Sequence, residues 1–150
     1  TGIILRFIEF MDVGASNGWR LDDVVSATEI LHHIETRWPI KPLEPNSAGE
    51  VAQRYRYCDG AGEIGLIASV TQPFCRNCSR IRLSTDGNLF TCLFASQGFD
   101  LKTPLRAGAD DATLLQAITS LWRHRQDRYS EQRSEATRGL HKIEMSYIGG

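Results

Sequence analysis

Residues 74–94 read FCRNCSRIRLSTDGNLFTCLF and predict a β-hairpin. The first predicted strand, 79–84, alternates polar with apolar residues, which is the period of a half-buried strand. Asp86-Gly87 is a dipeptide favoured in two-residue hairpin turns, because glycine tolerates a positive φ. The second predicted strand, 88–93, would therefore return the chain to the point where the first strand began.

Cysteines and arginines mark this hairpin. Cys75 and Cys78 form a C-x-x-C pair, and Cys92 lies on the returning strand. Arg80 and Arg82 are two residues apart, so they share one face of the first strand. The sequence therefore predicts three thiolates beside two guanidinium groups.

Three grouped cysteines suit a soft metal, either zinc or the iron of an iron–sulfur cluster. Structural zinc usually takes four protein ligands, whereas a cluster held by three thiolates leaves one iron open. Cys58 could equally be a small apolar residue with no ligand role. The candidates for a fourth zinc ligand are Cys58, His32, His33, His124 and His141.

Composition excludes several classes of protein. The chain has 150 residues, 41% of them hydrophobic and 23% charged, as expected of one globular domain. A net charge of −1 gives no electrostatic basis for binding nucleic acid or a membrane. The sequence shows neither a transmembrane run nor a signal-peptide pattern. Together with the metal-type cysteines, this favours a reducing, cytoplasmic compartment.

The first third of the chain predicts a strand followed by a helix. Residues 3–11 (IILRFIEFM) indicate a buried strand, in which Arg6 and Glu9 need partners or a cavity. The two could pair with each other or with a neighbour, or Arg6 could face an anionic ligand. Residues 12–20 predict a loop, placed either at an active site or on an ordinary surface.

A capping box, Ser26 with Glu29, predicts the start of the helix. Its apolar side chains follow at helical spacing and are expected to face the core: Ile30, Leu31, Ile34 and Trp38. Pro39 should end the helix, and the prolines at 42 and 45 predict a linker.

The remainder predicts strands at 51–57 and 63–70, a loop over 98–108, and a helix starting at Asp111 or Thr113. The leucines, isoleucine and tryptophan of that helix are expected to pack in the core. Residues 126–138 are polar and predict a solvated loop.

At the hairpin the chain resembles a known family. The pattern F-C-x-x-C-x-R-x-R-L-x-x-D-G-x-L-x-x-C-L-F is similar to the C-terminal cluster motif of the GTP 3′,8-cyclases, radical-SAM enzymes of molybdenum cofactor biosynthesis. Further similarity lies in Arg6–Gly14 (RFIEFMDVG), Gly65–Thr71 and the terminal Gly149-Gly150. The resemblance therefore extends over essentially the whole chain.

The resemblance implies an α+β fold. Residues 1–45 would be the last strand and helix of an incomplete (β/α) barrel. Residues 46–150 would be an antiparallel sheet subdomain with helices, carrying an iron–sulfur cluster. The family's N-terminal C-x-x-x-C-x-x-C motif is not among these residues, so we expect the chain to be the C-terminal part of a longer enzyme and inactive alone.

The resemblance also implies an activity, the conversion of GTP to (8S)-3′,8-cyclo-7,8-dihydroguanosine 5′-triphosphate by a radical-SAM lyase. S-adenosylmethionine and a second [4Fe–4S] cluster would be bound mainly by the N-terminal half, the partner of this chain, and a homodimer stays open. The residues that it assigns to this chain are Cys75, Cys78 and Cys92 as ligands of a [4Fe–4S] cluster and Arg6, Arg80 and Arg82 as GTP-binding groups.

Gly149 and Gly150 have two interpretations. Two terminal glycines are typical of a frayed end. The resemblance instead implies a catalytic tail, which reaches the pocket because it carries no side chains.

Two other functions remain open. One is a non-catalytic zinc module that uses Cys58 as its fourth ligand and binds a protein or nucleic acid. The other is a related radical-SAM enzyme that acts on a peptide, although such enzymes usually carry more C-terminal cysteines than this chain has.

Overall fold

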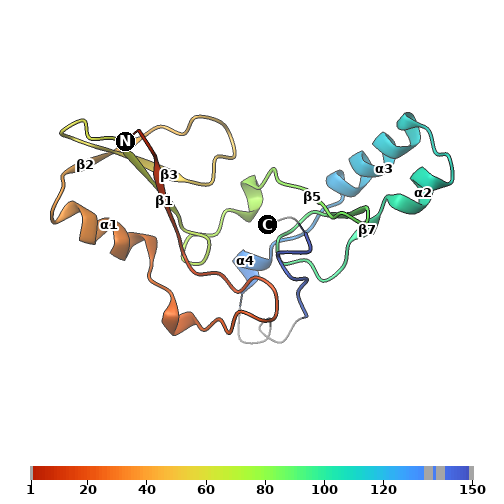
Figure 1. The fold of residues 1–150 in the computed structure, drawn as a ribbon, viewed down its shortest axis with the longest axis horizontal. Helices are drawn as coiled ribbons and strands as arrows, with labels where there is room; N and C mark the ends of the chain where they lie inside the picture. The colour runs from red at the N-terminus through yellow and green to blue at the C-terminus, as the bar shows by residue number, and fades with distance from the viewer. Residues whose placement is uncertain (1, 134–136, 138–140, 149–150) are drawn as a thin grey trace. The chain divides into compact units, whose positions relative to one another are not determined.

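The structure, a computed structural model, describes residues 2–133, 137 and 141–148 (Figure 1). The chain divides into two compact units, of which the first comprises Thr1–Met11 and Trp19–Cys78. The second comprises Asp12–Gly18 and Ser79–Gly150. Each unit has its own sheet, one mixed and one antiparallel, which confirms the predicted α+β class. Within the described ranges, no helix is both long enough and apolar enough to cross a membrane.

The first unit is built on a mixed sheet in the order β1-β4-β3-β2. β1 runs parallel to β4, and the other neighbours are antiparallel. The predicted hairpin at 51–57 and 63–70 is confirmed as β3 and β4. The elements are β1 (Leu5–Ile8), η1 (Leu21–Asp23), α1 (Ala27–Glu35), β2 (Ile40–Leu43), β3 (Gln53–Tyr57), β4 (Glu63–Ile67) and η2 (Cys75–Asn77).

The predicted linker around Pro42 was wrong, because Pro42 lies in β2 and pairs with Tyr55 of β3. Proline lacks an N–H and is tolerated in a sheet mainly at an edge. β2 is the last strand in the order of its sheet and pairs with β3 alone. The missing N–H of Pro42 therefore removes no hydrogen bond to a second neighbouring strand.

The start of α1 was predicted correctly. The Ser26 hydroxyl accepts a hydrogen bond from the Glu29 N–H at 3.1 Å. Ile30 and Leu31 pack against a small core of Ala27, Leu66 and Ala68, joined by Phe7 of β1 and Tyr55 of β3. Trp38 does not join this core: α1 ends at Glu35, and Trp38 is half exposed.

The N-terminal strand is shorter and more exposed than predicted. β1 covers Leu5–Ile8 rather than residues 3–11. Leu5 and Ile8 are 56% and 54% exposed, which contradicts the expectation of a buried strand. β1 is an edge strand whose one described neighbour is β4, and Phe7 is its residue that packs against the core.

The second unit contains an antiparallel sheet in the order β5-β6-β7. The strands predicted at 79–84 and 88–93 are shorter than expected, because β5 covers only Arg82–Leu83 and β6 only Asn88–Phe90. Residues 98–108, predicted as a loop, contain β7 and α2. The elements are β5 (Arg82–Leu83), β6 (Asn88–Phe90), β7 (Phe99–Asp100), α2 (Lys102–Arg106), α3 (Asp111–Arg123) and α4 (Tyr129–Gln132).

The turn between β5 and β6 has one residue more than predicted. Ser84 and Asn88 close it, since the Ser84 N–H donates to the Asn88 carbonyl at 2.9 Å. The Gly87 N–H donates back to the Ser84 carbonyl at 3.0 Å, and Gly87 has φ +87°. This is the geometry of a three-residue loop with glycine in the left-handed position.

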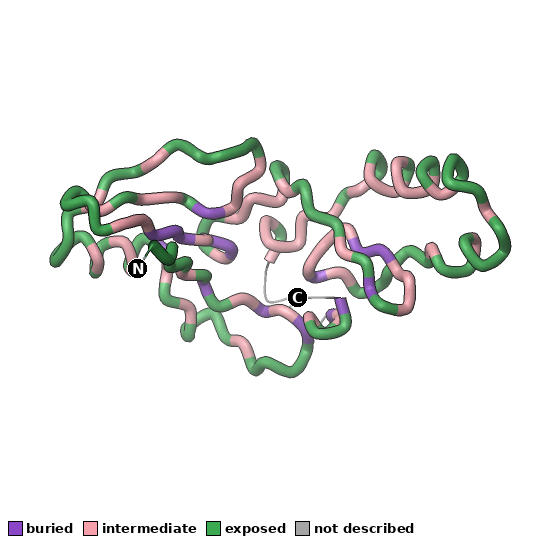
Figure 2. The backbone as a smooth tube through the Cα atoms, turned by 45° about the horizontal axis from the view of Figure 1, so that its top comes forward, coloured by how far each residue is buried: buried purple, intermediate pink, exposed green. Residues whose placement is uncertain are grey.

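α3 begins where predicted, but it does not pack in a core. Asp110 caps it by accepting a hydrogen bond from the Thr113 N–H at 2.8 Å. None of its residues is buried, and Leu115 is 65% exposed (Figure 2). The expected core role of this helix was therefore wrong. The apolar interior of the unit is formed instead by Leu89, Phe90, Phe94 and Ile148.

Candidate functional site

Cys75 and Cys78 lie on one tight turn of the first unit. Cys75 begins η2, and the Cys78 N–H donates to the Cys75 carbonyl at 3.3 Å. Both residues are half-buried. A C-x-x-C pair on a single turn is the usual arrangement for two ligands of one metal centre.

Cys92 lies in the second unit, two residues after β6. Its sulfur accepts a hydrogen bond from the Phe94 N–H at 3.4 Å. Cys92 also lines a cavity of about 430 Å³ with Phe94 and with Arg128, Tyr129 and other residues of the second unit.

The structure does not assemble a metal site from its described side chains. Among them, no three His, Cys, Asp or Glu residues are grouped to hold an ion. The grouping of Cys75, Cys78 and Cys92 therefore stays a prediction. Cys58, the fourth ligand in the alternative zinc hypothesis, is exposed.

Arg80 and Arg82 lie at the start of the cysteine hairpin. Arg82 is the first residue of β5, is half-buried and pairs with Phe90 of β6. Arg80 precedes the strand and is exposed. The structure thus places both guanidinium groups in the second unit, on the segment that follows Cys78.

Arg6 lies in β1, directly opposite Gly65 of β4. A Cβ at Gly65 would lie 3.4 Å from Cγ of Arg6, so the glycine leaves room for the arginine stem. The guanidinium is 4.0 Å from the Glu50 carboxylate, and the side chain is 42% exposed. The Arg6 guanidinium is therefore accessible to solvent, and its ion pair with Glu50 is weak.

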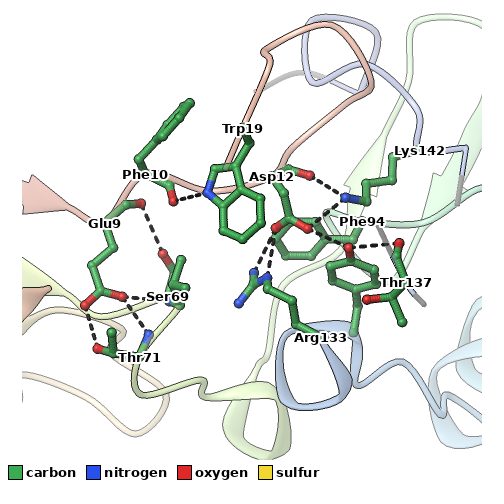
Figure 3. A network of polar contacts seen from close by, with 12 residues as sticks. Glu9, Phe10, Asp12, Trp19, Ser69, Thr71, Phe94, Arg133, Thr137 and Lys142 are labelled. Carbon is green, nitrogen blue, oxygen red and sulfur yellow. Dashed lines mark hydrogen bonds and ion pairs between the residues drawn. The ribbon is translucent and has the colours of Figure 1, made fainter. Parts of the chain in front are cut away.

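Glu9 is a buried carboxylate whose partners are mainly backbone groups, not the salt bridge considered from the sequence (Figure 3). It accepts hydrogen bonds from the N–H groups of Ala27, Val70 and Thr71 at 2.7–2.8 Å and from the Thr71 hydroxyl at 2.6 Å. Burial raises the pKa of Glu9, but these bonds, led by those of Thr71, lower it overall. Glu9 thus joins the end of β1 to the N-terminus of α1 and to the segment before Cys75.

Asp12 forms a second buried network, which the sequence did not reveal. Its carboxylate accepts hydrogen bonds from Lys142 at 2.8 Å, Tyr129 at 2.5 Å and Arg133 at 3.0 Å. Burial raises the pKa of Asp12, but the bonds from Lys142, Tyr129 and Arg133 lower it overall. Tyr129 also stacks on Phe94, with ring centroids 4.6 Å apart.

The Asp12 network supports the wall of the Cys92 cavity. Phe94 and Tyr129 both line that cavity, and Lys142 lies 4.8 Å from the centre of the Tyr129 ring. Sequence reasoning missed the network because Lys142 is 130 positions from Asp12. No local pattern predicts such a pairing.

The C-terminal segment is fixed to the turn of the cysteine hairpin. The Tyr147 hydroxyl donates to the Asp86 carboxylate at 2.6 Å, and Ile148 is buried. Hydrogen bonds from Ser84, Tyr147 and Asn88 lower the pKa of Asp86 to about 2. Gly149 and Gly150, predicted as catalytic, lie outside the described residues.

The fold is that of an α+β protein, and it places a C-x-x-C pair on one turn and two arginines at the start of the hairpin that follows along the chain. Residues 3–131 match the family described as Molybdenum Cofactor Synthesis C. The chain belongs to this family, because the match covers most of its length.

Curated relatives are similar over almost the whole chain. A protein of Acidothermus cellulolyticus named GTP 3′,8-cyclase is 53% identical over 99% of this chain and 48% of its own length. Proteins of the same name from Xanthomonas campestris pv. campestris and Synechococcus sp. are 51% and 48% identical, over 44% and 42% of their own lengths. The chain thus spans about half the length of the curated relatives it matches.

Proposed function

We propose that this chain is the C-terminal portion of a GTP 3′,8-cyclase of molybdenum cofactor biosynthesis. The observation that carries the proposal is the identity of about half of all positions to proteins of that name, over nearly the entire chain. The reaction would convert GTP to (8S)-3′,8-cyclo-7,8-dihydroguanosine 5′-triphosphate. S-adenosylmethionine and its [4Fe–4S] cluster would be bound mainly by the N-terminal half, so this chain alone would be inactive.

Cys75, Cys78 and Cys92 would hold a further [4Fe–4S] cluster in this chain. The donor set fits: all three are half-buried cysteines, Cys75 and Cys78 share a turn, and an N–H donates to the Cys92 sulfur. Thiolates are the usual ligands of such clusters. A cluster bound through three of its irons supplies one open iron, to which the guanine base of GTP can bind.

Arg6, Arg80 and Arg82 would bind the triphosphate. A guanidinium group presents a planar fork of N–H donors that matches phosphate oxygens, and it stays charged at all physiological pH values. Arg6 and Arg80 are exposed, and the stem of Arg6 is positioned beside Gly65. Their role is to neutralise and orient the phosphates, which fixes the ribose and base at the reacting centre.

The two terminal glycines would complete the catalytic pocket. Tyr147 and Ile148 anchor the residues just before them on the second unit. A tail without side chains can approach a substrate closely through its backbone groups. The domain boundary at 45/46, a cytoplasmic location and a homodimer remain proposals of the same kind.

Anaerobic reconstitution with iron and sulfide tests the ligand assignment. The chain should bind about four irons and absorb near 400 nm, and serine at Cys75, Cys78 or Cys92 should abolish this. Cys58→Ser is the matched control and should bind iron like the wild type. Stoichiometric zinc in a colourless protein, or loss of iron in Cys58→Ser, would favour the zinc module instead.

The activity itself requires both halves of the enzyme. Full-length protein with S-adenosylmethionine, a reductant and GTP should form the cyclised nucleotide, detected by anaerobic chromatography. Absence of that product from fully reconstituted wild-type enzyme would overturn the proposed function.

A further inference from the structure

Residues 141–148, here called the C-terminal strap, form a run of contacts across the second unit. Lys142 donates to both the backbone carbonyl and the carboxylate of Asp12, at 2.9 and 2.8 Å. The next residue, Ile143, donates its N–H to the carbonyl of Ala95 at 3.2 Å. The strap therefore binds loop 12–18 on one side and the segment after Cys92 on the other.

Glu144 binds the loop at two further residues. Its carboxylate accepts hydrogen bonds from the Ala15 N–H at 2.9 Å and the Ser16 hydroxyl at 3.1 Å. A Cβ on Gly14 would collide with this carboxylate, and Gly14 has φ +66°. Glycine at position 14 is therefore what lets Glu144 reach the backbone of the loop.

The strap ends on the cysteine hairpin. Tyr147 donates to Asp86 at 2.6 Å, and its ring packs edge-on against Phe90 at 6.2 Å between centroids. Ile148 is 1% exposed. The start of the strap is thus bound to Asp12 of loop 12–18, and its end is bound to Asp86 in the turn of the hairpin.

We propose that Glu144 is a positioning residue that holds loop 12–18 in its substrate-binding arrangement, an inference that rests on the proposed function. Loop 12–18 begins four residues after the end of β1 (Leu5–Ile8), the strand that carries Arg6. The resemblance implies that this strand is the last of an incomplete barrel, and in barrels the loops that follow the strands at their carboxyl ends form the active site. A loop with glycines at both Gly14 and Gly18 has high conformational entropy when unbound, so an external clamp lowers the entropy that substrate binding must remove.

The electrostatics of Glu144 agree with a clamp. The Ala15 N–H and the Ser16 hydroxyl lower the pKa of Glu144, so the carboxylate stays ionised at neutral pH. A charged acceptor forms stronger hydrogen bonds with N–H and O–H donors than a neutral one. Glu144→Gln should therefore retain an acceptor but hold the loop less firmly.

Hydrogen exchange on the full-length enzyme, read by mass spectrometry, tests the clamp without any substrate. Glu144→Ala should speed exchange in peptides covering residues 12–18 by about tenfold or more, and Glu144→Gln should fall between it and the wild type. Ser146→Ala changes an exposed residue of the same strap and should leave exchange unchanged. If Glu144→Ala does not fold, Ser16→Ala removes one of the two bonds and should give a smaller increase.

Kinetics on the same samples test the consequence for substrate. Glu144→Ala should raise the KM for GTP about tenfold with a smaller change in kcat, at unchanged iron content. Glu144→Gln should have a KM between those of the wild type and Glu144→Ala. Unchanged exchange in Glu144→Ala, or faster exchange with unaltered KM and kcat, would overturn the proposal. A wild-type enzyme that does not cyclise GTP would overturn the proposed function, and with it the role in substrate binding, while the exchange data would still decide whether Glu144 clamps the loop.

Discussion

Lys142 and Asp12 form a buried ion pair 130 positions apart, with Nζ 2.8 Å from Oδ2 and both side chains 5% exposed. Tyr129 and Arg133 bind the same carboxylate, so its charge is compensated from several directions. Removing Lys142 would leave the buried Asp12 carboxylate with Arg133 as its remaining cation. The pair should therefore contribute to the stability of the second unit.

Lys142→Met should lower the free energy of unfolding by less than the about 3–5 kcal/mol lost when a buried charge is left without a partner, because Arg133 still pairs with Asp12. The measurement is urea denaturation followed by circular dichroism. Lys102→Met, a change at an exposed lysine of the same unit, is the control and should shift stability by no more than about 0.5 kcal/mol. Equal free energies of unfolding for the two variants would mean that the charge of the Lys142–Asp12 pair contributes little to stability.

The Glu9 carboxylate should make stability depend on pH. Its pKa is lower in the folded protein than its usual value of 4.5, so its contribution is complete above about pH 4.5 and is lost as the pH falls through the folded value. Glu9→Gln presents an amide to backbone N–H donors and should cost about 1–3 kcal/mol at pH 7 for each donor left unpaired.

The test compares urea midpoints of wild type and Glu9→Gln between pH 7 and pH 3. The difference should be largest at neutral pH and should shrink below pH 4.5, because the wild-type carboxylate then takes up a proton. Glu44→Gln, at an exposed residue, controls for the change of net charge. A difference independent of pH would argue that packing, and not the charge of Glu9, carries the effect.

Local chemistry predicted the starts of α1 and α3 and the glycine of the hairpin turn, but not whether α3 packs in a core. The Ser26 cap and the left-handed Gly87 act within a few residues of sequence, so their signals are present in the chain itself. The exposure of Leu115 depends on whether another layer covers α3, which helical spacing does not encode. The spacing of the apolar residues predicted the helix α3 correctly, but the expectation that these residues pack in a core was wrong.

The candidate site shows the same division. The C-x-x-C pair is visible from its spacing alone, and the structure places its two cysteines on the turn at η2. The Asp12 network and the strap depend on contacts between residues that are far apart in sequence, such as Glu144 with Ala15, 129 positions away. Such pairings are set by tertiary packing, so one sequence without its structure gives no signal for them.

GTP affinity should depend on Arg80 and Arg82. Alanine at either position in the full-length enzyme should weaken binding by about 1.5–3 kcal/mol, the value of a charge-assisted hydrogen bond. Lysine should restore affinity only in part, because it lacks the guanidinium fork. Binding is measured at fixed salt, with iron content checked in every variant.

Arg123→Ala is the control for this series, since Arg123 is an exposed arginine in the last turn of α3. It should bind GTP like the wild type. If Arg80→Ala and Arg82→Ala bind GTP equally well with an intact cluster, both arginines have a structural role only.

Deleting the terminal glycines should reduce turnover without affecting stability. Deleting Gly149 and Gly150 removes no side chain, so the free energy of unfolding should change by less than about 0.5 kcal/mol. In the full-length enzyme the deletion should leave iron content and GTP binding largely intact but suppress cyclisation. Alanine at either position should also impair turnover, because a methyl group crowds the tail and disfavours positive φ. Product formation by anaerobic chromatography is measured beside thermal unfolding, and wild-type turnover in the truncated enzyme would show that the tail takes no part in catalysis.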